Sequence, residues 1–439
     1  MAATATTRVV LAGAIGNIVE WYDFGLYGLL APVLASLFFP SHDRIAALLA
    51  VYGGFAVGFA VRPLGAVVLG RVGDHQGRKF VLVFSVVLMG AATVAIGLLP
   101  PYAAIGIWAP ILLIAIRIFQ GFSVGGEFVG SVTYLVEIAP DNRRGIAGSV
   151  ANIGATIGML MAAGAAALAS SYSHAFHQLW RVPFLFGGVL AFTGYLLRRH
   201  LPPDSADVES AQPVHASAEQ RGALKRWPAL QAFREAPRTM LFALLFTSGY
   251  GVSNYLVMVF LPTFAHEFAR VSDAAALRIN TAGQALVLLL APLAGWASDR
   301  LLRRRTMLAL AFALQAVVAW TSFTWVAHLG LAGLWAAQML LAGLLAVVMG
   351  TAPAMLSEQF ERGYRVSAHA LVLNAGIGIA GGTAPMVGVA LIRATGSNLA
   401  PAAYLAAACA ASAIAALFLM DRSRKPLEQS DAVPRSMHQ

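Results

Sequence analysis

The sequence carries very little charge for its length. Of its 439 residues, 11% are Asp, Glu, Lys or Arg and 59% are hydrophobic, and the mean hydropathy is +0.72. A water-soluble domain carries about 25% charged residues. A chain this apolar would expose mostly apolar surface to water, so a soluble globular protein is excluded and lipid is the expected solvent.

Several other features are missing, and each absence excludes a type of chemistry. The single cysteine, Cys409, lies in an apolar run, so an intrachain disulfide is excluded. No G-x-x-x-x-G-K-[ST] sequence is present to hold a nucleotide phosphate, and the ten histidines show no metal-ligand spacing. None of these histidines is expected deep inside a span. We therefore expect no ATP-driven step, no metal or other cofactor, and no enzyme activity.

Apolar runs long enough to cross a bilayer are frequent. A helix needs ~20 apolar residues to cross ~30 Å of hydrocarbon, and open strands are excluded there because unpaired backbone groups are costly. The predicted fold is therefore an all-α integral membrane protein. Its twelve predicted spans are residues 9–38, 45–69, 80–99, 109–136, 145–169, 182–200, 238–264, 277–298, 306–327, 331–356, 367–392 and 400–420.

Basic residues are distributed unevenly over the connections between these runs. If both termini are cytoplasmic, the outer loops hold only Arg44, Arg181, Arg270, Arg278 and Arg393. The excess on the other side predicts cytoplasmic ends and explains the net charge of +10 without a nucleic-acid partner. The Pro- and Ser-rich segment 201–236 predicts a cytoplasmic linker. It divides an N-terminal six-helix half (1–200) from a C-terminal six-helix half (237–420), which a short cytoplasmic tail (421–439) follows.

Two loop motifs recur in both halves. One has a glycine, an aspartate four residues later and an arginine four residues after that; the other has a glutamate and an arginine seven residues later. Helix caps and positive-inside anchors would also explain single loops, but repetition favours a gating latch between duplicated halves that move about a midplane site. The copies are slightly over 220 residues apart: Gly70, Asp74 and Arg78 match Gly295, Asp299 and Arg303, and Glu137 and Arg144 match Glu358 and Arg365.

Two acids lie inside the first apolar run, in the stretch G-N-I-V-E-W-Y-D-F. A carboxylate in hydrocarbon costs ~3 kcal/mol and needs a partner or a function. At 1.5 Å per residue, Asp23 lies ~21 Å from the inner face and Arg117 lies ~18 Å from it. Glu20 precedes Asp23 by three residues and shares nearly the same helix face. We therefore expect Asp23 and Glu20 to be the partners of Arg117.

Two roles fit these three residues. A carboxyl that alternates between apolar surroundings and a nearby arginine can load and release a proton. On this hypothesis Asp23 carries the proton, with Glu20 as the second candidate, and Arg117 modulates it or contacts an anionic substrate. The alternative is a permanent ion pair that positions two helices.

Other polar residues within the spans are candidates for substrate binding or gating. Contact between helices explains each of them equally well when it is taken singly. Glu127 lies near the inner boundary and is expected in an inner gate, and Arg62 fits an anchor or a gate. No acid lies inside the last six spans, so coupling is expected in the first half. The candidate substrate contacts are Tyr27, Arg117, Gln120, Tyr250, Asn254, Gln284 and Asn374.

Five segments carry a resemblance to a known family. They are R-P-L-G-A-V-V-L-G-R-V-G-D-H-Q-G-R-K (62–79), R-I-F-Q-G-F-S-V-G-G-E-F (117–128), E-I-A-P-D-N-R-R-G (137–145), W-R-V-P-F (180–184) and N-I-V-E-W-Y-D-F (17–24). Together they resemble the major facilitator superfamily, and within it the metabolite:proton symporter family. The match is dense in the first half and looser in the second. His75 departs from the family's usual Lys or Arg, and segment 358–367 lacks its usual proline.

The resemblance implies a proton-coupled symporter of the bacterial inner membrane that imports a small organic solute by alternating access. Substrates of the family include dicarboxylates and tricarboxylates, shikimate-like acids, and proline or betaine. Arg117 favours a carboxylate such as 2-oxoglutarate or citrate. The alternatives are a proline/betaine-type or shikimate-type symporter, or an uncoupled uniporter or exporter. The expected partners are the solute, protons and the lipid bilayer, and the expected oligomeric state is a monomer.

Overall fold

The molecule is a bundle of helices. The computed structural model describes residues 2–76, 78–123, 127–172, 176–199, 228–361 and 363–423, and over these residues no strand is present. Within the same residues, eight helices are long and apolar enough to cross a membrane, or nine when the bent pair α1–α2 counts as one span. The prediction of an all-α membrane fold is confirmed.

A first set of helices, α1 to α10, precedes residue 200. The bend of 63° between α1 and α2 follows from Pro32, which lacks the N–H that would continue the hydrogen bonding of α1. The helices of the first set are α1 (Ala2–Leu29), α2 (Ala31–Phe38), α3 (Arg44–Ala60), α4 (Arg62–Gln76), α5 (Arg78–Leu98), α6 (Tyr102–Ile105), α7 (Trp108–Ser123), α8 (Glu127–Ile138), α9 (Arg144–Ser171) and α10 (Arg181–Arg199).

The second set runs from α13 to α19, after the short helix α12 (Pro228–Glu235). Because α12 lies within 201–236, the end of the predicted linker is helical. The single helix α16 covers two predicted spans, since it joins two helices at Gly330, where φ is 55° and ψ is −122°. The second set comprises α13 (Pro237–Tyr255), η2 (Leu256–Phe260), α14 (Leu261–Ala269), α15 (Asp273–Arg300), α16 (Arg304–Ser357), α17 (Arg365–Leu373), η3 (Asn374–Gly381), α18 (Gly382–Thr395) and α19 (Ala400–Phe418).

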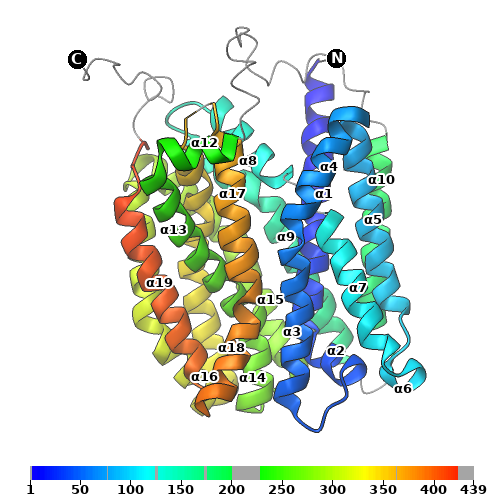
Figure 1. The fold of residues 1–439 in the computed structure, drawn as a ribbon. Helices are drawn as coiled ribbons and strands as arrows, with labels where there is room; N and C mark the ends of the chain where they lie inside the picture. The colour runs from blue at the N-terminus through cyan, green and yellow to red at the C-terminus, as the bar shows by residue number, and fades with distance from the viewer. Residues whose placement is uncertain are drawn as a thin grey trace, which may run out of the picture.

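The helices follow the predicted spans in order. Each of the twelve predicted ranges overlaps a helix or a run of consecutive helices. The chain turns back after each span, so α1 begins and α19 ends at the same end of the bundle, which we call the upper end (Figure 1). The lower end holds α2, α6 and α14. The division into two six-helix halves stays a prediction.

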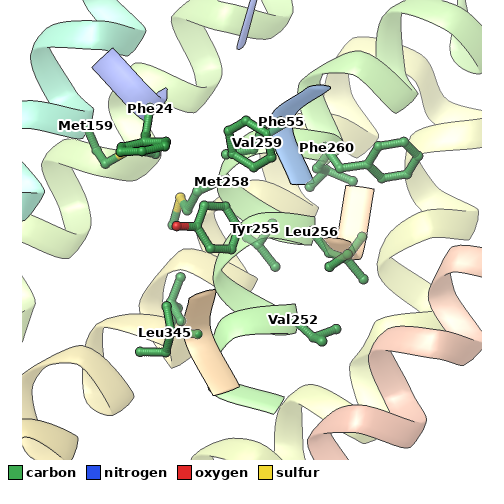
Figure 2. Close-up of a cluster of buried hydrophobic side chains, with 14 of the residues drawn as sticks. Phe24, Phe55, Met159, Val252, Tyr255, Leu256, Met258, Val259, Phe260 and Leu345 are labelled. Atoms are coloured by element: carbon green, nitrogen blue, oxygen red, sulfur yellow. The ribbon is translucent and has the colours of Figure 1, made fainter. Parts of the chain in front are cut away.

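The two sets pack side by side and meet along a few helices. In Figure 1 the first set lies mainly to the right and the second mainly to the left. Helix α9 packs against α15 and α16, and α3 packs against α18. Figure 2 shows part of this junction, where Phe55 of the first set lies near Tyr255 and Val259 of the second. This junction is where a site shared by the two sets can form.

The outer surface is as apolar as the composition predicts. Leu168, Leu289 and Val317 expose 65%, 68% and 74% of their surface, respectively. Large aliphatic side chains at such positions would be unfavourable in water and are favourable against lipid tails. Polar side chains that are buried in the bundle therefore stand out, because lipid offers them no hydrogen bonds.

Candidate functional site

Asp23 on α1 lies at the centre of a buried polar cluster. Its Oδ1 accepts hydrogen bonds from Thr93 Oγ1 and Gln120 Nε2, each at 2.6 Å, and its Oδ2 lies 3.3 Å from Arg117 Nη1. Asp23 and Arg117 are 1% and 0% exposed. The pairing of these two residues, expected from their depths, is thus present in the structure. Thr93 on α5 was missed, although a threonine in a largely apolar span is itself a signal.

The hydrogen bonds of this cluster suit either protonation state of Asp23. Arg117 Nη1 donates to Gln120 Oε1 at 2.6 Å, which leaves the Gln120 amide N–H to face Asp23. Thr93 Oγ1 also lies 2.8 Å from the carbonyl oxygen of Met89. A hydroxyl has one hydrogen. Thr93 can therefore donate to an ionised Asp23, or donate to Met89 and accept from a protonated Asp23, without any movement of the helices.

The Arg117 guanidinium is enclosed by aromatic rings. Its central carbon lies 4.3 Å from the ring centre of Tyr27 and 4.8 Å from that of Phe24, within the range of cation–π attraction. Tyr27 itself donates to the carbonyl oxygen of Val51 at 3.2 Å. Among the described residues, Arg117 Nε and Nη2 have no hydrogen-bond partner. The arginine therefore keeps N–H groups available beyond those that face Asp23 and Gln120.

Glu20 pairs with Arg62 and not with Arg117, which corrects the expected pairing. Arg62 Nη1 lies 3.5 Å from Glu20 Oε1, and its guanidinium lies 4.1 Å from the ring centres of both Phe24 and Phe59. The reason is depth. Glu20 is about one helical turn nearer the upper end than Asp23, and the break between α3 and α4 brings Arg62 to that level.

A pocket of about 70 Å³ adjoins this ion pair. Its lining includes Glu20, Arg62 and Arg198 of the first set and Asn374 of the second. Asn374 Nδ2 donates to the carbonyl oxygen of Ala370 at 2.9 Å, which fixes the side chain on η3. The pocket therefore combines one acid, two guanidinium groups and an amide at the junction of the two sets.

The remaining candidates for substrate contact lie at different places. Tyr250, Asn254 and Asn152 of α9 line a second pocket of about 30 Å³. Gln284 is 3% exposed, and its Nε2 has no partner among the described residues, but it lines neither pocket. The structure thus brings Tyr250, Asn254 and Asn374 to the junction and leaves Gln284 apart.

The repeated Glu and Arg residues meet across the two sets at the upper end. Arg144 Nη1 lies 2.9 Å from Glu358 Oε1, and Arg365 Nη1 lies 2.6 Å from Glu137 Oε1. Each glutamate pairs with the arginine of the other copy of its motif. Arg304 also contacts Glu358, so this carboxylate bridges two buried arginines. These pairs must separate for the upper end to open between the sets.

Asp299 forms a further link between the sets at this end. Its carboxylate accepts hydrogen bonds from the backbone N–H groups of Gly145 and Ile146, at 2.7 and 3.0 Å, and so caps the start of α9. Its arginine partner is Arg304, at 2.6 Å. The arginine of the repeated motif is Arg303, the residue before Arg304. Arg303 precedes α16 as its N-cap and is exposed, whereas Arg304 is the first residue inside the helix.

The segment after α19 packs onto the same end. The backbone N–H of Arg305 donates to Asp421 at 3.1 Å, and Arg144 Nη2 donates to the carbonyl oxygen of Arg422 at 3.2 Å. Burial alone would raise the pKa of Asp421. Hydrogen bonds from Ser423 and Arg305 outweigh it and hold this pKa below its ordinary value. Asp421 is therefore a stabilising anion at neutral pH.

Other contacts join the two sets at the lower end. Arg44 Nη2 lies 2.6 Å from Glu267 Oε1, and Tyr52 donates to Thr263 at 2.9 Å. Contacts between the two sets are therefore present at both ends of the bundle, among the residues that the structure describes.

One histidine is buried in the bundle, although its position lies near the end of a predicted span. His369 of α17 is 0% exposed, and it is the buried one among the described histidines. It follows Arg365 by one helical turn, inside an apolar stretch. The sequence did not predict this burial, because His369 lies two residues inside the predicted span 367–392 and span boundaries read from a sequence are uncertain by several residues.

Some predicted roles fall outside the described residues. They are the roles of Gly70 and of the side chains of Asp74, Arg78 and Glu127, so the expected latch and gate contacts of these residues are not described. The described part of the chain holds no group of three or more His, Cys, Asp or Glu side chains that would bind a metal ion.

Comparison with known proteins places this geometry in a family. The profile of the Sugar (and other) transporter family matches residues 9–433. The chain is 31% identical to the ectoine/proline transporter ProP of Corynebacterium glutamicum, over 94% of this chain and 84% of the relative. It is also 31% identical to the glycine betaine/proline/ectoine/pipecolic acid transporter OusA of Dickeya dadantii, over 96% of this chain and 84% of the relative.

Solved structures show the same fold. A D-xylose-proton symporter superposes with a TM-score of 0.73 at 16% identity, covering 94% of this chain and 97% of the other. The inward-open xylose transporter XylE of Escherichia coli superposes with a TM-score of 0.72 at 16% identity, covering 97% and 98%. The chain therefore has the fold of the major facilitator superfamily and belongs to the Sugar (and other) transporter family, and it is a multi-pass membrane transporter and not an enzyme.

Proposed function

We propose that this transporter is a proton-coupled symporter that imports a small zwitterionic solute of the proline/betaine type. It works in the bacterial inner membrane by alternating access, with both termini cytoplasmic and Asp23 as the proton carrier. The observation that carries the proposal is the fully buried Asp23 carboxylate, whose hydrogen bonds suit both the ionised and the protonated form.

The coupling mechanism follows from that cluster. When Asp23 is ionised, Arg117 and Gln120 face its charge. When it is protonated, Arg117 loses its counter-charge, and its positive charge then favours an anionic group of the solute at the junction of the two sets. Protonation and solute binding favour each other, because the anion of the solute replaces the charge that Asp23 gives up.

The two gates supply the alternating access. Release of the solute at the upper end requires the exchanged pairs Arg144–Glu358 and Arg365–Glu137 to part, while the Arg44–Glu267 contact at the lower end holds. Opening of the lower end requires the reverse: the Arg44–Glu267 contact parts while the two pairs at the upper end hold. We assign the upper end to the cytoplasm because the basic connections of the chain gather there.

The choice of substrate rests on the relatives and on the charges at the pocket. The sequence favoured a dicarboxylate or tricarboxylate, but relatives named for proline, betaine and ectoine support the alternative better. Glu20 beside Arg62 and Arg198 presents both signs of charge to one pocket, as a zwitterion requires. A citrate-like anion would instead face the Glu20 carboxylate.

Uptake into liposomes tests this function. Purified protein is reconstituted, and entry of labelled proline, glycine betaine, 2-oxoglutarate and citrate is measured with and without an inward proton gradient. We expect gradient-driven accumulation of proline or glycine betaine and none of the two acids. Accumulation of citrate or 2-oxoglutarate would refute the substrate class, and equal entry regardless of the gradient would refute coupling.

A further inference from the structure

The second pocket, which Tyr250 and Asn254 line, lies between the two sets of helices. Its walls come from α1, α8 and α9 of the first set and from α13, α16, α17 and η3 of the second. It shares Trp21 with the pocket beside Glu20, so the two pockets adjoin. No acid lines it. The polar lining residues are Trp21, Asn152, Tyr250, Asn254 and His369.

Only one of the two ring nitrogens of His369 has polar neighbours among the described residues. Its Nδ1 lies 3.4 Å from Thr133 Oγ1 of the first set and 3.5 Å from Ser357 Oγ. Its Nε2 is buried and has no hydrogen-bond partner among the described residues. A buried ring nitrogen without a partner is unfavourable, and such an atom in a native structure calls for a missing ligand or water. Here the ring lines a pocket at the junction that must open and close during transport.

We propose that His369 Nε2 is a substrate contact, which donates a hydrogen bond to the carboxylate of the bound solute. The inference rests on the proposed function, and it adds a residue from the second set to a site otherwise centred on the first. A carboxylate is the group that fits because the polar lining of this pocket can donate N–H and O–H groups and includes no competing anion.

The charges on either side of Trp21 set the orientation of the solute. Glu20 lies on one side, where its carboxylate and the indole ring suit the ammonium end of a zwitterion. His369 lies on the other side, with the neutral donors. Arg62 lies in the pocket with Glu20, and its charge is balanced by that carboxylate at 3.5 Å and by two aromatic rings, while its Nε and Nη2 have no hydrogen-bond partner among the described residues. A bound solute would then touch both sets at once and hold them closed around it.

Two substitutions of His369 distinguish the roles of its two ring nitrogens. The amide of Gln in His369→Gln reaches the position of Nε2, whereas the amide of Asn in His369→Asn reaches only that of Nδ1. Equilibrium binding of labelled proline, and competition by prolinamide, which lacks the carboxylate, are measured on the purified full-length protein. Thr133→Val is the matched control, because it removes a hydroxyl from the Nδ1 edge alone.

We expect His369→Gln and Thr133→Val to bind proline within about twofold of the unmodified protein. His369→Asn should bind it about tenfold more weakly, the effect of one hydrogen bond to a charged group, with prolinamide binding unchanged. A thermal unfolding curve for each variant checks folding.

Three results would overturn the inference. If His369→Asn binds proline normally, or weakens proline and prolinamide equally, Nε2 does not meet the carboxylate. If His369→Gln and Thr133→Val lose binding while His369→Asn keeps it, the histidine acts through its Nδ1 edge as a structural link. If the unmodified protein binds neither proline nor glycine betaine, the proposed function fails together with the inference.

Discussion

Replacing Asp23 by Asn is the most direct test of the coupling mechanism. Asparagine has nearly the shape of a protonated aspartate but cannot release a proton. Its side-chain oxygen can still accept from Thr93 and Gln120 in the geometry that Asp23 uses. The variant should therefore resemble the proton-loaded transporter, which binds and exchanges solute but cannot return its proton.

The size of the effect follows from the gradient. One pH unit is worth about 1.4 kcal/mol per proton, which supports about tenfold accumulation if one proton enters with each solute. We expect about tenfold accumulation for the unmodified protein and a ratio of about one for Asp23→Asn. Exchange of labelled for unlabelled solute without a gradient should persist in the variant.

Stability needs a control, because the substitution leaves Arg117 buried without its counter-charge. Removing one partner of a buried pair costs about 3–5 kcal/mol, partly offset here by Gln120 and the aromatic rings around the guanidinium. The double variant Asp23→Asn with Arg117→Gln removes both charges and should recover thermal stability but not accumulation. Glu20→Gln removes the other acid of α1 and should weaken solute binding, measured as exchange, while the accumulation that remains still follows the proton gradient.

Concentrative uptake by folded Asp23→Asn would refute the mechanism. It would show that the proton travels by another group and that Asp23 and Arg117 form a structural pair. Loss of accumulation in Glu20→Gln, with solute exchange retained, would instead move the proton to Glu20.

Three further predictions concern the packing that surrounds the site. Glu358→Gln should destabilise the protein by about 3–5 kcal/mol, because it leaves two buried arginines facing a neutral group. The exposed Glu361→Gln is the control. Equal thermal unfolding curves for the two variants would contradict a stabilising role of Glu358 between the arginines. Gly121→Ala should lower the yield of folded protein, since an added Cβ would fall on the backbone of α3, whereas Gly343→Ala meets nothing within 4 Å and should have no effect. The stabilisation by Asp421 should be present above about pH 4 and be lost as the pH falls through the lowered pKa of this residue. The unfolding temperature of Asp421→Asn should therefore fall less with acid than that of the unmodified protein.

Much of the architecture follows from the sequence because the lipid solvent constrains it strongly. Only helices satisfy their backbone in hydrocarbon, so long apolar runs predict spans. The regular rise of a helix converts residue number into depth, and that conversion placed Asp23 and Arg117 at one level. It also explains why each predicted span overlaps a helix of the structure.

The pairing of residues could not be obtained in that way. The sequence showed that Glu137 and Glu358 begin equivalent motifs, but only the folded chain shows that each pairs with the arginine of the other copy. It also gave Glu20 the wrong arginine, because Glu20 lies about one helical turn nearer the upper end than Asp23, at the level to which the break between α3 and α4 brings Arg62. Arg304, not Arg303, meets Asp299 because the start of α16 falls between them.

The sequence by itself therefore determined the class of protein, the spans, and the depth of the charged residues within them. All three depend on hydrophobicity and helix rise, which are local properties of the chain. The tertiary structure alone decided which helices face one another, and with that the partners of Asp23, the exchanged ion pairs and the burial of His369. These depend on the rotation and packing of helices, which side chains distant in the sequence set together.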